Sequence, residues 1–216
     1  MSSLYTQLQS DIRFQEGLTA CMNCGICTAI CPAAAYYDYD PREICQEVQS
    51  NDEQTLIDLL KGDTIWMCGQ CLSCKARCPR NNTPGYIISA LRTLSQQTGY
   101  FAHSRMGRQQ LRIKRTVGES ILKEGYCVHP KLLVPAEHPE QGPVWQWTLN
   151  HGKELFAQLG SNYYEAGEGG VRKIDDDTLG ELHAIFSETG GLDFFNRIEE
   201  GMKNRPTADE DQDSLF

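Results

Sequence analysis

The chain has 216 residues, a formal net charge of −9, 40% hydrophobic residues and ten cysteines. This length allows one or two domains with a modest core. The acidic balance argues against nucleic acid as a main partner, and the lack of any run of 18 apolar residues excludes a membrane span.

The N-terminal residues contain no basic stretch followed by an apolar core, so we expect no secretory signal and a cytoplasmic protein. Two near-identical cysteine runs then follow. Both have the pattern C-x2-C-x2-C-x3-C-P, and they begin 47 residues apart at Cys21 and Cys68. Runs of this pattern hold [4Fe–4S] clusters. The predicted cluster ligands are Cys21, Cys24, Cys27, Cys31, Cys68, Cys71, Cys74 and Cys78.

The segment between the two runs is predicted to be helical. Asp40 followed by Pro41 is typical of an N-cap and a first helical position. Apolar residues then recur at helical spacing, with a break at residues 50–52 and an end at Gly62. No alternating strand flanks either run, so we predict an all-α fold. Another helix should begin near Thr83, with one apolar side formed by Ile87, Ile88, Leu91 and Leu94.

Residues 101–115 carry five positive charges and no acidic residue. One interpretation is a docking patch for an acidic partner. The other is a solvated helix face that offsets the charge of the anionic clusters. The five cations are Arg105, Arg108, Arg112, Lys114 and Arg115.

Residues 125–147 are predicted to form a long loop, because four prolines and two glycines interrupt regular structure. The loop either embraces a partner or packs against its own chain. Helices are predicted again at about 151–159 and at about 176–202, the latter divided at 190–191. The acidic residues 205–216 are predicted to be disordered.

The two cysteine runs are expected to exchange ligands. Each iron of a cubane takes one thiolate, and in two-cluster proteins each run lends its last cysteine to the other cluster. One predicted cluster therefore has Cys21, Cys24, Cys27 and Cys78 as ligands, and the other has Cys68, Cys71, Cys74 and Cys31. Because metal binding and folding are coupled, the apo-protein should fold poorly. Structural zinc is disfavoured because it uses separated cysteine pairs, and disulfides because they need an oxidising compartment.

The paired runs, bridged by 36 mostly helical residues between Cys31 and Cys68, resemble the helical ferredoxin domain. That domain occurs in succinate dehydrogenase, fumarate reductase, anaerobic glycerol-3-phosphate dehydrogenase, glycolate oxidase and heterodisulfide reductase. The chain lacks the upstream [2Fe–2S] cysteines of succinate dehydrogenase. It also lacks the downstream Cys-Cys-Gly repeat of glycerol-3-phosphate dehydrogenase and glycolate oxidase. It most resembles the C subunit of heterodisulfide reductase, including bacterial reductase-like complexes of sulfur metabolism, over roughly residues 15–100.

This resemblance implies an electron-transfer subunit in a hetero-oligomer. It would relay single electrons through two [4Fe–4S] clusters between a flavin-containing A-type subunit and a catalytic B-type subunit that handles a thiol, disulfide or other sulfur compound. No catalytic residue or substrate site is recognisable, so the chain is interpreted as an oxidoreductase subunit. We expect a helical ferredoxin domain at 1–100, a helical and loop-rich extension for partner docking at 101–204, and the tail at 205–216.

Other functions stay open. The chain could serve another flavin-dependent dehydrogenase complex, act as a non-catalytic iron–sulfur sensor or assembly subunit, or be a small disulfide reductase that uses Cys127. Cys127 is either incidental or reactive. Cys45, at helical spacing beside Ile44 and Val48, is predicted to be a buried inert thiol.

Cations within the second run predict a difference between the two clusters. Lys75 and Arg77 lie between ligands and Arg80 follows them, whereas the first run has Thr28 and Ile30 at the equivalent positions. Positive charge favours the more negative reduced state, so the second cluster should have the higher reduction potential. The alternative is that these side chains reach solvent and have little effect.

Overall fold

The computed structural model describes residues 3–204, so the predicted disordered tail at 205–216 lies outside the described residues. Among the described residues the regular structure is helical and no β-strand occurs, which confirms the predicted all-α class. No helix within that range is long and apolar enough to cross a bilayer. The described chain divides into two compact units: residues 3–108 with 200–204, and residues 109–199.

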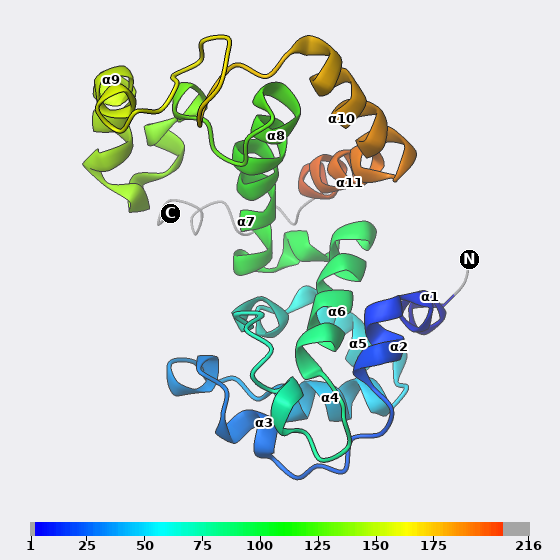
Figure 1. The fold of residues 1–216 in the computed structure, drawn as a ribbon. Coiled ribbons are helices and arrows are strands. Elements are labelled where there is room, and N and C mark those ends of the chain that lie inside the picture. The colour runs from blue at the N-terminus through cyan, green and yellow to red at the C-terminus, as the bar shows by residue number, and fades with distance from the viewer. Residues whose placement is uncertain (1–2, 205–216) are drawn as a thin grey trace. The chain divides into compact units, whose positions relative to one another are not determined.

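The first unit is built around one central helix, α6 (Pro84–Thr98). Four further helices pack against α6 (Figure 1): α1 (Leu4–Ser10), α2 (Ile12–Gly17), α4 (Pro41–Gln49) and α5 (Glu53–Lys61). The short α3 (Ile26–Ala29) lies within the first cysteine run, and α7 (Arg105–Ile113) begins in this unit. The predicted apolar side of α6 forms the middle of the core, since Ile87, Ile88, Leu91 and Leu94 are all buried.

The ends of α4 and α5 follow from their capping residues. The carboxylate of Asp40 accepts hydrogen bonds from the backbone N–H groups of Arg42 and Glu43, which satisfies donors that have no partner within the helix. Asp52 does the same for Thr55 at the start of α5. Residue 62 follows the last turn of α5, so the predicted boundaries of both helices are confirmed.

A close approach between α2 and α6 fixes where the chain enters the first cysteine run. A Cβ atom on Gly17 would lie 3.1 Å from Cγ1 of Ile87, so this position has room only for a small residue. The backbone N–H of Thr83 donates to the carbonyl oxygen of Gly17 at 2.7 Å. The residues that precede both helix α6 and the first run are thereby held together.

The second unit contains the rest of α7, a π-helical turn at Lys114–Gly118, α8 (Glu119–Glu124), α9 (Pro143–Gln158), α10 (Asp176–Glu188) and most of α11 (Gly191–Lys203). The predicted pair of helices at 176–202, divided at 190–191, is confirmed. Asp175 caps α10 by accepting from the backbone N–H of Thr178 at 2.8 Å. A Cβ atom on Gly118 would lie 2.5 Å from Cζ of Phe195, so the π-helical turn packs tightly against α11.

The prediction of one loop over residues 125–147 is wrong at its C-terminal end. Helix α9 begins at Pro143, eight residues before the predicted start, because proline fits the first helical position, where no backbone donor is needed. Gly142 precedes it with a φ of 59°. The rest of the segment contains three short 3₁₀ turns, at Pro130–Leu132, Pro135–Glu137 and Pro139–Gln141, so prolines start these turns rather than preventing them.

The basic stretch at 101–115 is partly buried and partly ion-paired. Arg108, in the first unit, is buried. In the second unit, Lys114 Nζ lies 3.0 Å from carboxylate oxygens of both Glu119 and Glu199, and Arg115 binds Glu199 through Nε at 3.0 Å and Nη2 at 2.8 Å. Glu119 and the more distant Glu199 therefore neutralise two of the five cations. A role of this segment in partner docking stays a prediction.

Candidate iron–sulfur site

The two cysteine runs share an unusual backbone conformation. Asn23 and Gly25 flank the second cysteine of the first run with φ angles of 60° and 77°, and Gln70 and Leu72 flank that of the second run at 51° and 58°. Left-handed residues such as these form concave backbone turns whose N–H groups converge on anionic groups, including iron–sulfur sites. The backbone N–H of Gln70 donates to Cys68 Sγ at 3.4 Å. The repeat in the sequence is thus a repeat in local structure.

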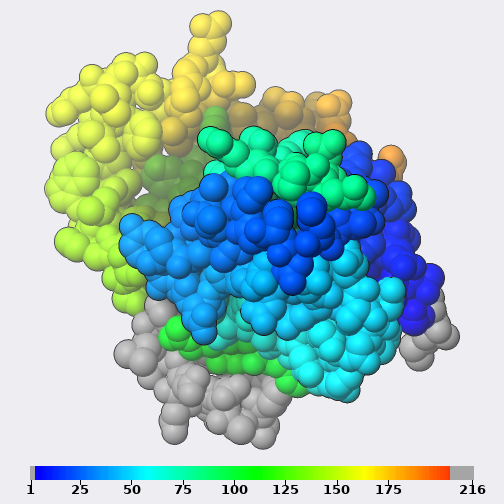
Figure 2. All heavy atoms as spheres, turned by 90° about the horizontal axis from the view of Figure 1, so that it is seen from below, coloured from blue at the N-terminus to red at the C-terminus, as the bar shows by residue number. Residues whose placement is uncertain are grey.

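Asn82 joins the end of the second run to the start of the first. It is only 2% exposed, and its side-chain oxygen accepts from the backbone N–H of Thr19 at 2.8 Å. Its amide nitrogen donates to the carbonyl oxygen of Ala20 at 3.0 Å. On the face shown in Figure 2, the green-blue segment near residue 80 lies against the blue segment that contains the first run. Cys21 is therefore brought close to the chain that leaves Cys78.

Helix α4 holds Cys21 from the other side. The backbone N–H of Cys21 donates to Gln49 Oε1 at 2.5 Å, and the side-chain amides of Gln46 and Gln49 each donate to its carbonyl oxygen at 3.3 Å. The backbone N–H and carbonyl group of Cys21, the first predicted ligand, are thus both hydrogen-bonded by residues of one turn of α4. This arrangement fixes the direction from which the first run enters the site.

The eight predicted ligands gather around two cavities of the first unit. One cavity is lined by cysteines of both runs, namely Cys21, Cys24, Cys27 and Cys78. The other is also lined by both runs, through Cys31, Cys68, Cys71 and Cys74, and Cys27 lies on its edge as well. The last cysteine of each run therefore lies at the cavity formed mainly by the other run.

The two cavities differ in size. The cavity beside Cys68 has a volume of about 360 Å³, whereas the cavity beside Cys21 has a volume of about 20 Å³. Four thiols around each cavity, with left-handed backbone turns beside them, are a donor set that fits a cubane. No three Cys, His, Asp or Glu side chains in residues 3–204 are close enough to hold a single metal ion. A cubane differs in this respect, because each of its four irons takes its own thiolate.

Burial affects the thiols of the two runs unequally. Desolvation raises the pKa of Cys27 to about 11 and also raises the pKa of Cys74. A hydrogen bond with Ser73 lowers the pKa of the exposed Cys71. Because thiolates are the ligands of iron–sulfur clusters, loading a cluster at neutral pH must release protons from these half-buried cysteines.

Cations lie near both cavities. Arg42 and Arg80 line the one beside Cys21. Near the other, Arg92 of α6 donates through Nη2 to the carbonyl oxygen of Cys68 at 2.7 Å and through Nε to that of Ile65, also at 2.7 Å. Sequence reasoning missed Arg92, although it is the only charged residue in α6, a feature that could have identified it.

The cations singled out from the sequence have other neighbours. Lys75 Nζ lies 5.1 Å from the centre of the Tyr86 ring, at cation–π distance. Arg77 is exposed, and Arg80 lies at the cavity beside Cys21, not at the one beside Cys68. The predicted difference in potential between the clusters thus has cationic contributions on both sides, and it stays a prediction.

The two remaining cysteines differ in exposure. Cys45 is 1% exposed on α4, which confirms the prediction that this thiol is buried, and burial raises its pKa strongly. That the thiol is inert stays a prediction. It also lies at the cavity beside Cys21. Cys127 is exposed, in the second unit.

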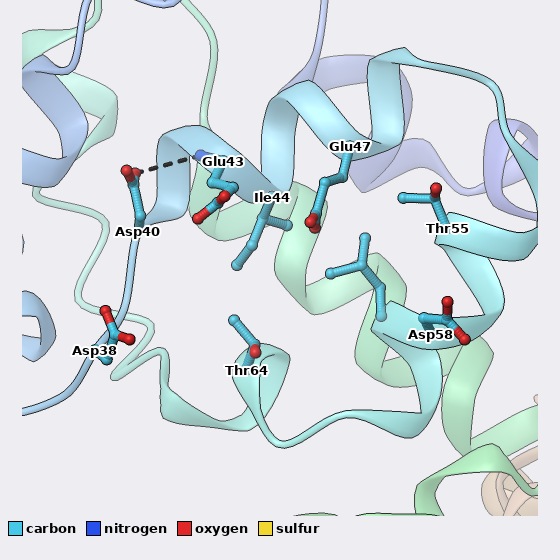
Figure 3. Close-up of a pocket in the computed structure, with 9 residues that line it drawn as sticks. Asp38, Asp40, Glu43, Ile44, Glu47, Thr55, Asp58 and Thr64 are labelled. Atoms are coloured by element: carbon cyan, nitrogen blue, oxygen red, sulfur yellow. Dashed lines mark hydrogen bonds between the residues drawn. The ribbon is translucent and has the colours of Figure 1, made fainter.

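An acidic groove of about 480 Å³ lies between α4, α5 and the 3₁₀ turn at Thr64–Met67. Figure 3 shows Glu43 and Glu47 extending from α4 toward the turn that carries Thr64. Burial, and then the charge of Glu43, raises the pKa of Glu47. The carboxylates that line the groove belong to Asp38, Asp40, Glu43, Glu47 and Asp58. Part of the negative charge of the first unit is therefore concentrated next to the segment that leads from the first run into α4.

An all-helical unit with two thiol-lined cavities defines the class of two-cluster iron–sulfur proteins. A family model described as a 4Fe-4S dicluster domain matches residues 17–82, and the protein carries two [4Fe–4S] clusters. The chain is 32% identical over 189 residues to the C subunit of the ferredoxin:CoB-CoM heterodisulfide reductase of Methanosarcina acetivorans, covering 88% of this chain and 67% of that protein. The chain belongs to the family of heterodisulfide reductase C subunits.

Two further relatives support this assignment. The chain is 33% identical over 143 residues to the C2 subunit of the H(2)/formate:CoB-CoM heterodisulfide,ferredoxin reductase of Methanococcus maripaludis, with 64% of this chain and 71% of that protein covered. It is 32% identical over 126 residues to the second C-type iron–sulfur subunit of the CoB--CoM heterodisulfide reductase of Methanocaldococcus jannaschii, with 57% and 64% covered. The chain spans between 50% and 71% of the length of the relatives matched.

Proposed function

We propose that the chain is the electron-transfer subunit of a heterodisulfide reductase-like complex. It passes single electrons between a flavin-containing A-type subunit and a catalytic B-type subunit that acts on a thiol, disulfide or other sulfur compound. The relatives support this proposal, because their names describe them as C subunits of heterodisulfide reductases. We place the complex in the cytoplasm, since free thiols persist in a reducing compartment.

The main observation that supports an electron relay is that one equivalent cysteine in each run is exposed. Cys24 and Cys71 are exposed, while the other six predicted ligands are half-buried. Bound [4Fe–4S] clusters supply one-electron transfer. The chain surrounds most of each cavity with protein and leaves one ligand of each at the surface. Two surface positions of this kind suit an electron that enters from one partner and leaves to another.

We further propose that the runs exchange their last ligands. Cys21, Cys24 and Cys27 share one cluster with Cys78, and Cys68, Cys71 and Cys74 share the other with Cys31. The hydrogen bonds of Asn82 to Thr19 and Ala20 support this pairing. The exchange makes each cavity depend on both runs, so loss of one run should impair both sites.

The relay is tested in a complex purified anaerobically through a tag on this chain. We expect flavin and a catalytic subunit to co-purify, and Cys71→Ala to lose about half of the iron of this subunit and to abolish electron flux between the partners. Cys127→Ala is the matched control, because it removes an exposed cysteine outside the two runs.

Three results would contradict the relay. Unchanged flux in Cys71→Ala would show that electrons bypass this chain. Loss of flux in Cys127→Ala with full iron content would instead support a disulfide reductase that uses its own thiol. Clusters that show no reversible reduction in the assembled complex would favour a sensor or an assembly subunit.

A further inference from the structure

A buried tyrosine hydroxyl at the larger cavity has no hydrogen-bond partner. Tyr39 is 4% exposed, and its Oη forms no hydrogen bond with any residue in the described part of the chain. A buried hydroxyl without a partner destabilises the folded protein, because it has lost its hydrogen bonds to water. Groups of this kind in folded proteins mark the place of a water, an ion or a ligand.

The local backbone holds Tyr39 in place. It directly precedes Asp40, whose carboxylate caps α4, binds the guanidinium of Arg42 at 2.6 Å and accepts a hydrogen bond from the hydroxyl of Thr28. Thr28 belongs to α3 inside the first cysteine run. The segment that carries Tyr39 is therefore tied both to α4 and to the loop that supplies the first run's ligands. A residue fixed in this way is suited to a constant contact with a bound group.

The surroundings of Tyr39 indicate what its hydroxyl binds. Tyr39 lines the cavity of about 360 Å³ together with Cys31 and Cys68. A tyrosine hydroxyl is protonated at neutral pH, because its ordinary pKa is about 10, and it can therefore donate a hydrogen bond. Sulfur of a cluster or its thiolate ligands is the acceptor that this cavity would provide.

We propose that Tyr39 donates a hydrogen bond to a sulfur of the cluster held in this cavity and thereby raises its reduction potential. Hydrogen bonds to the sulfurs are among the factors that set such potentials, because they stabilise the more negative reduced state. The proposal rests on the cluster ligands proposed above, but it does not need the relay or its partners. Tyr39 acts as a tuning residue and exchanges no electrons itself.

The first test is Tyr39→Phe, which removes the hydroxyl and keeps the ring. The variant and the unsubstituted full chain, both loaded with clusters, are titrated anaerobically and followed by electron paramagnetic resonance, with iron and sulfide counted. One of the two midpoint potentials should fall, with the ratio of reduced to oxidised cluster decreasing about tenfold at fixed potential, equivalent to about 59 mV for one electron. The other potential should stay unchanged.

Tyr37→Phe is the matched control, because Tyr37 lines the same cavity but is 50% exposed. It should change neither potential. If Tyr39→Phe keeps its full iron content and neither potential moves, the proposal is overturned. This is the result expected if the hydroxyl binds a buried water instead of the cluster. An equal shift of both potentials would also overturn it, because that result indicates a general change of the fold.

A second substitution covers the case in which Tyr39→Phe fails to hold its clusters. Incorporating 3-fluorotyrosine at position 39 acidifies the phenol and makes it a stronger donor while it keeps the hydroxyl. The same potential should then rise, opposite in sign to the effect of phenylalanine. No rise with full iron content would refute the hydrogen bond. Since both titrations use this chain without partners, failure of the relay would leave their outcome unchanged.

Discussion

Replacing Asn82 by alanine should release the connection between the two cysteine runs. The side chain is 2% exposed and makes two hydrogen bonds of 2.8 Å and 3.0 Å, to the backbone of Thr19 and of Ala20. Each bond contributes about 1 kcal/mol net, so Asn82→Ala should lose about 2 kcal/mol. If the contacts are broken in the transition state for unfolding, the unfolding rate rises about 30-fold.

The assay is the anaerobic rate of cluster loss at a fixed urea concentration, followed by visible absorbance. A rate is the suitable measure, because iron–sulfur proteins unfold irreversibly once the metal is released. Asn196→Ala serves as the control, since Asn196 is exposed on α11 and a surface change of this kind should stay within about 0.5 kcal/mol. If Asn82→Ala loses its clusters no faster than the control, the hydrogen bonds of Asn82 do not hold the two runs together.

Three further predictions concern backbone conformation, charge and potential. Gly25→Ala should destabilise the protein by about 1 kcal/mol and speed cluster loss about fivefold, because a side chain at φ 77° is strained. Gly69→Ala is the control, since its φ is ordinary and the space around it is also open. Equally fast cluster loss in both variants would contradict this reasoning. Hydrogen bonds, the strongest from Arg115, lower the pKa of Glu199 from 4.5 to about 2. The carboxylate therefore stabilises the folded protein fully above pH 4.5, and this contribution is lost as the pH falls toward 2. The increase in the urea unfolding rate that Glu199→Gln causes at pH 7 should therefore shrink on acidification, and an increase that grows would exclude the ion pair. The double variant Lys75→Gln, Arg77→Gln removes both cations inside the second run and should lower the reduction potential of its cluster. An unchanged midpoint potential in a redox titration would refute their role.

The helices of the first unit could be predicted because their signals are local. Asp40 before Pro41 caps the start of α4, and Gly62 follows α5 in an extended conformation, so residues at the helix ends themselves predict these boundaries. The spacing within each cysteine run acts over a few residues in the same way. The same local reasoning failed at Pro143, where proline was taken to interrupt a helix, although it starts α9.

The residues that sequence reasoning missed all act through tertiary contacts. Asn82 meets Thr19 across 63 positions, and no sequence pattern marks this role. Arg92 reaches Cys68 across 24 positions, and its only sequence signal is that it is the single charged residue of α6. The orphaned hydroxyl of Tyr39 is visible only when its burial is known. Local patterns thus predicted the ligands, whereas the contacts that we propose to position and tune the clusters required the fold.

The exchange of ligands between the two cysteine runs is tested most directly by an iron anomalous-scattering map from crystals of the anaerobically purified protein. We predict two four-iron clusters, with Cys78 bound to the cluster of the first run and Cys31 bound to the cluster of the second. A map in which Cys31 binds the same cluster as Cys21, Cys24 and Cys27 would contradict the exchange.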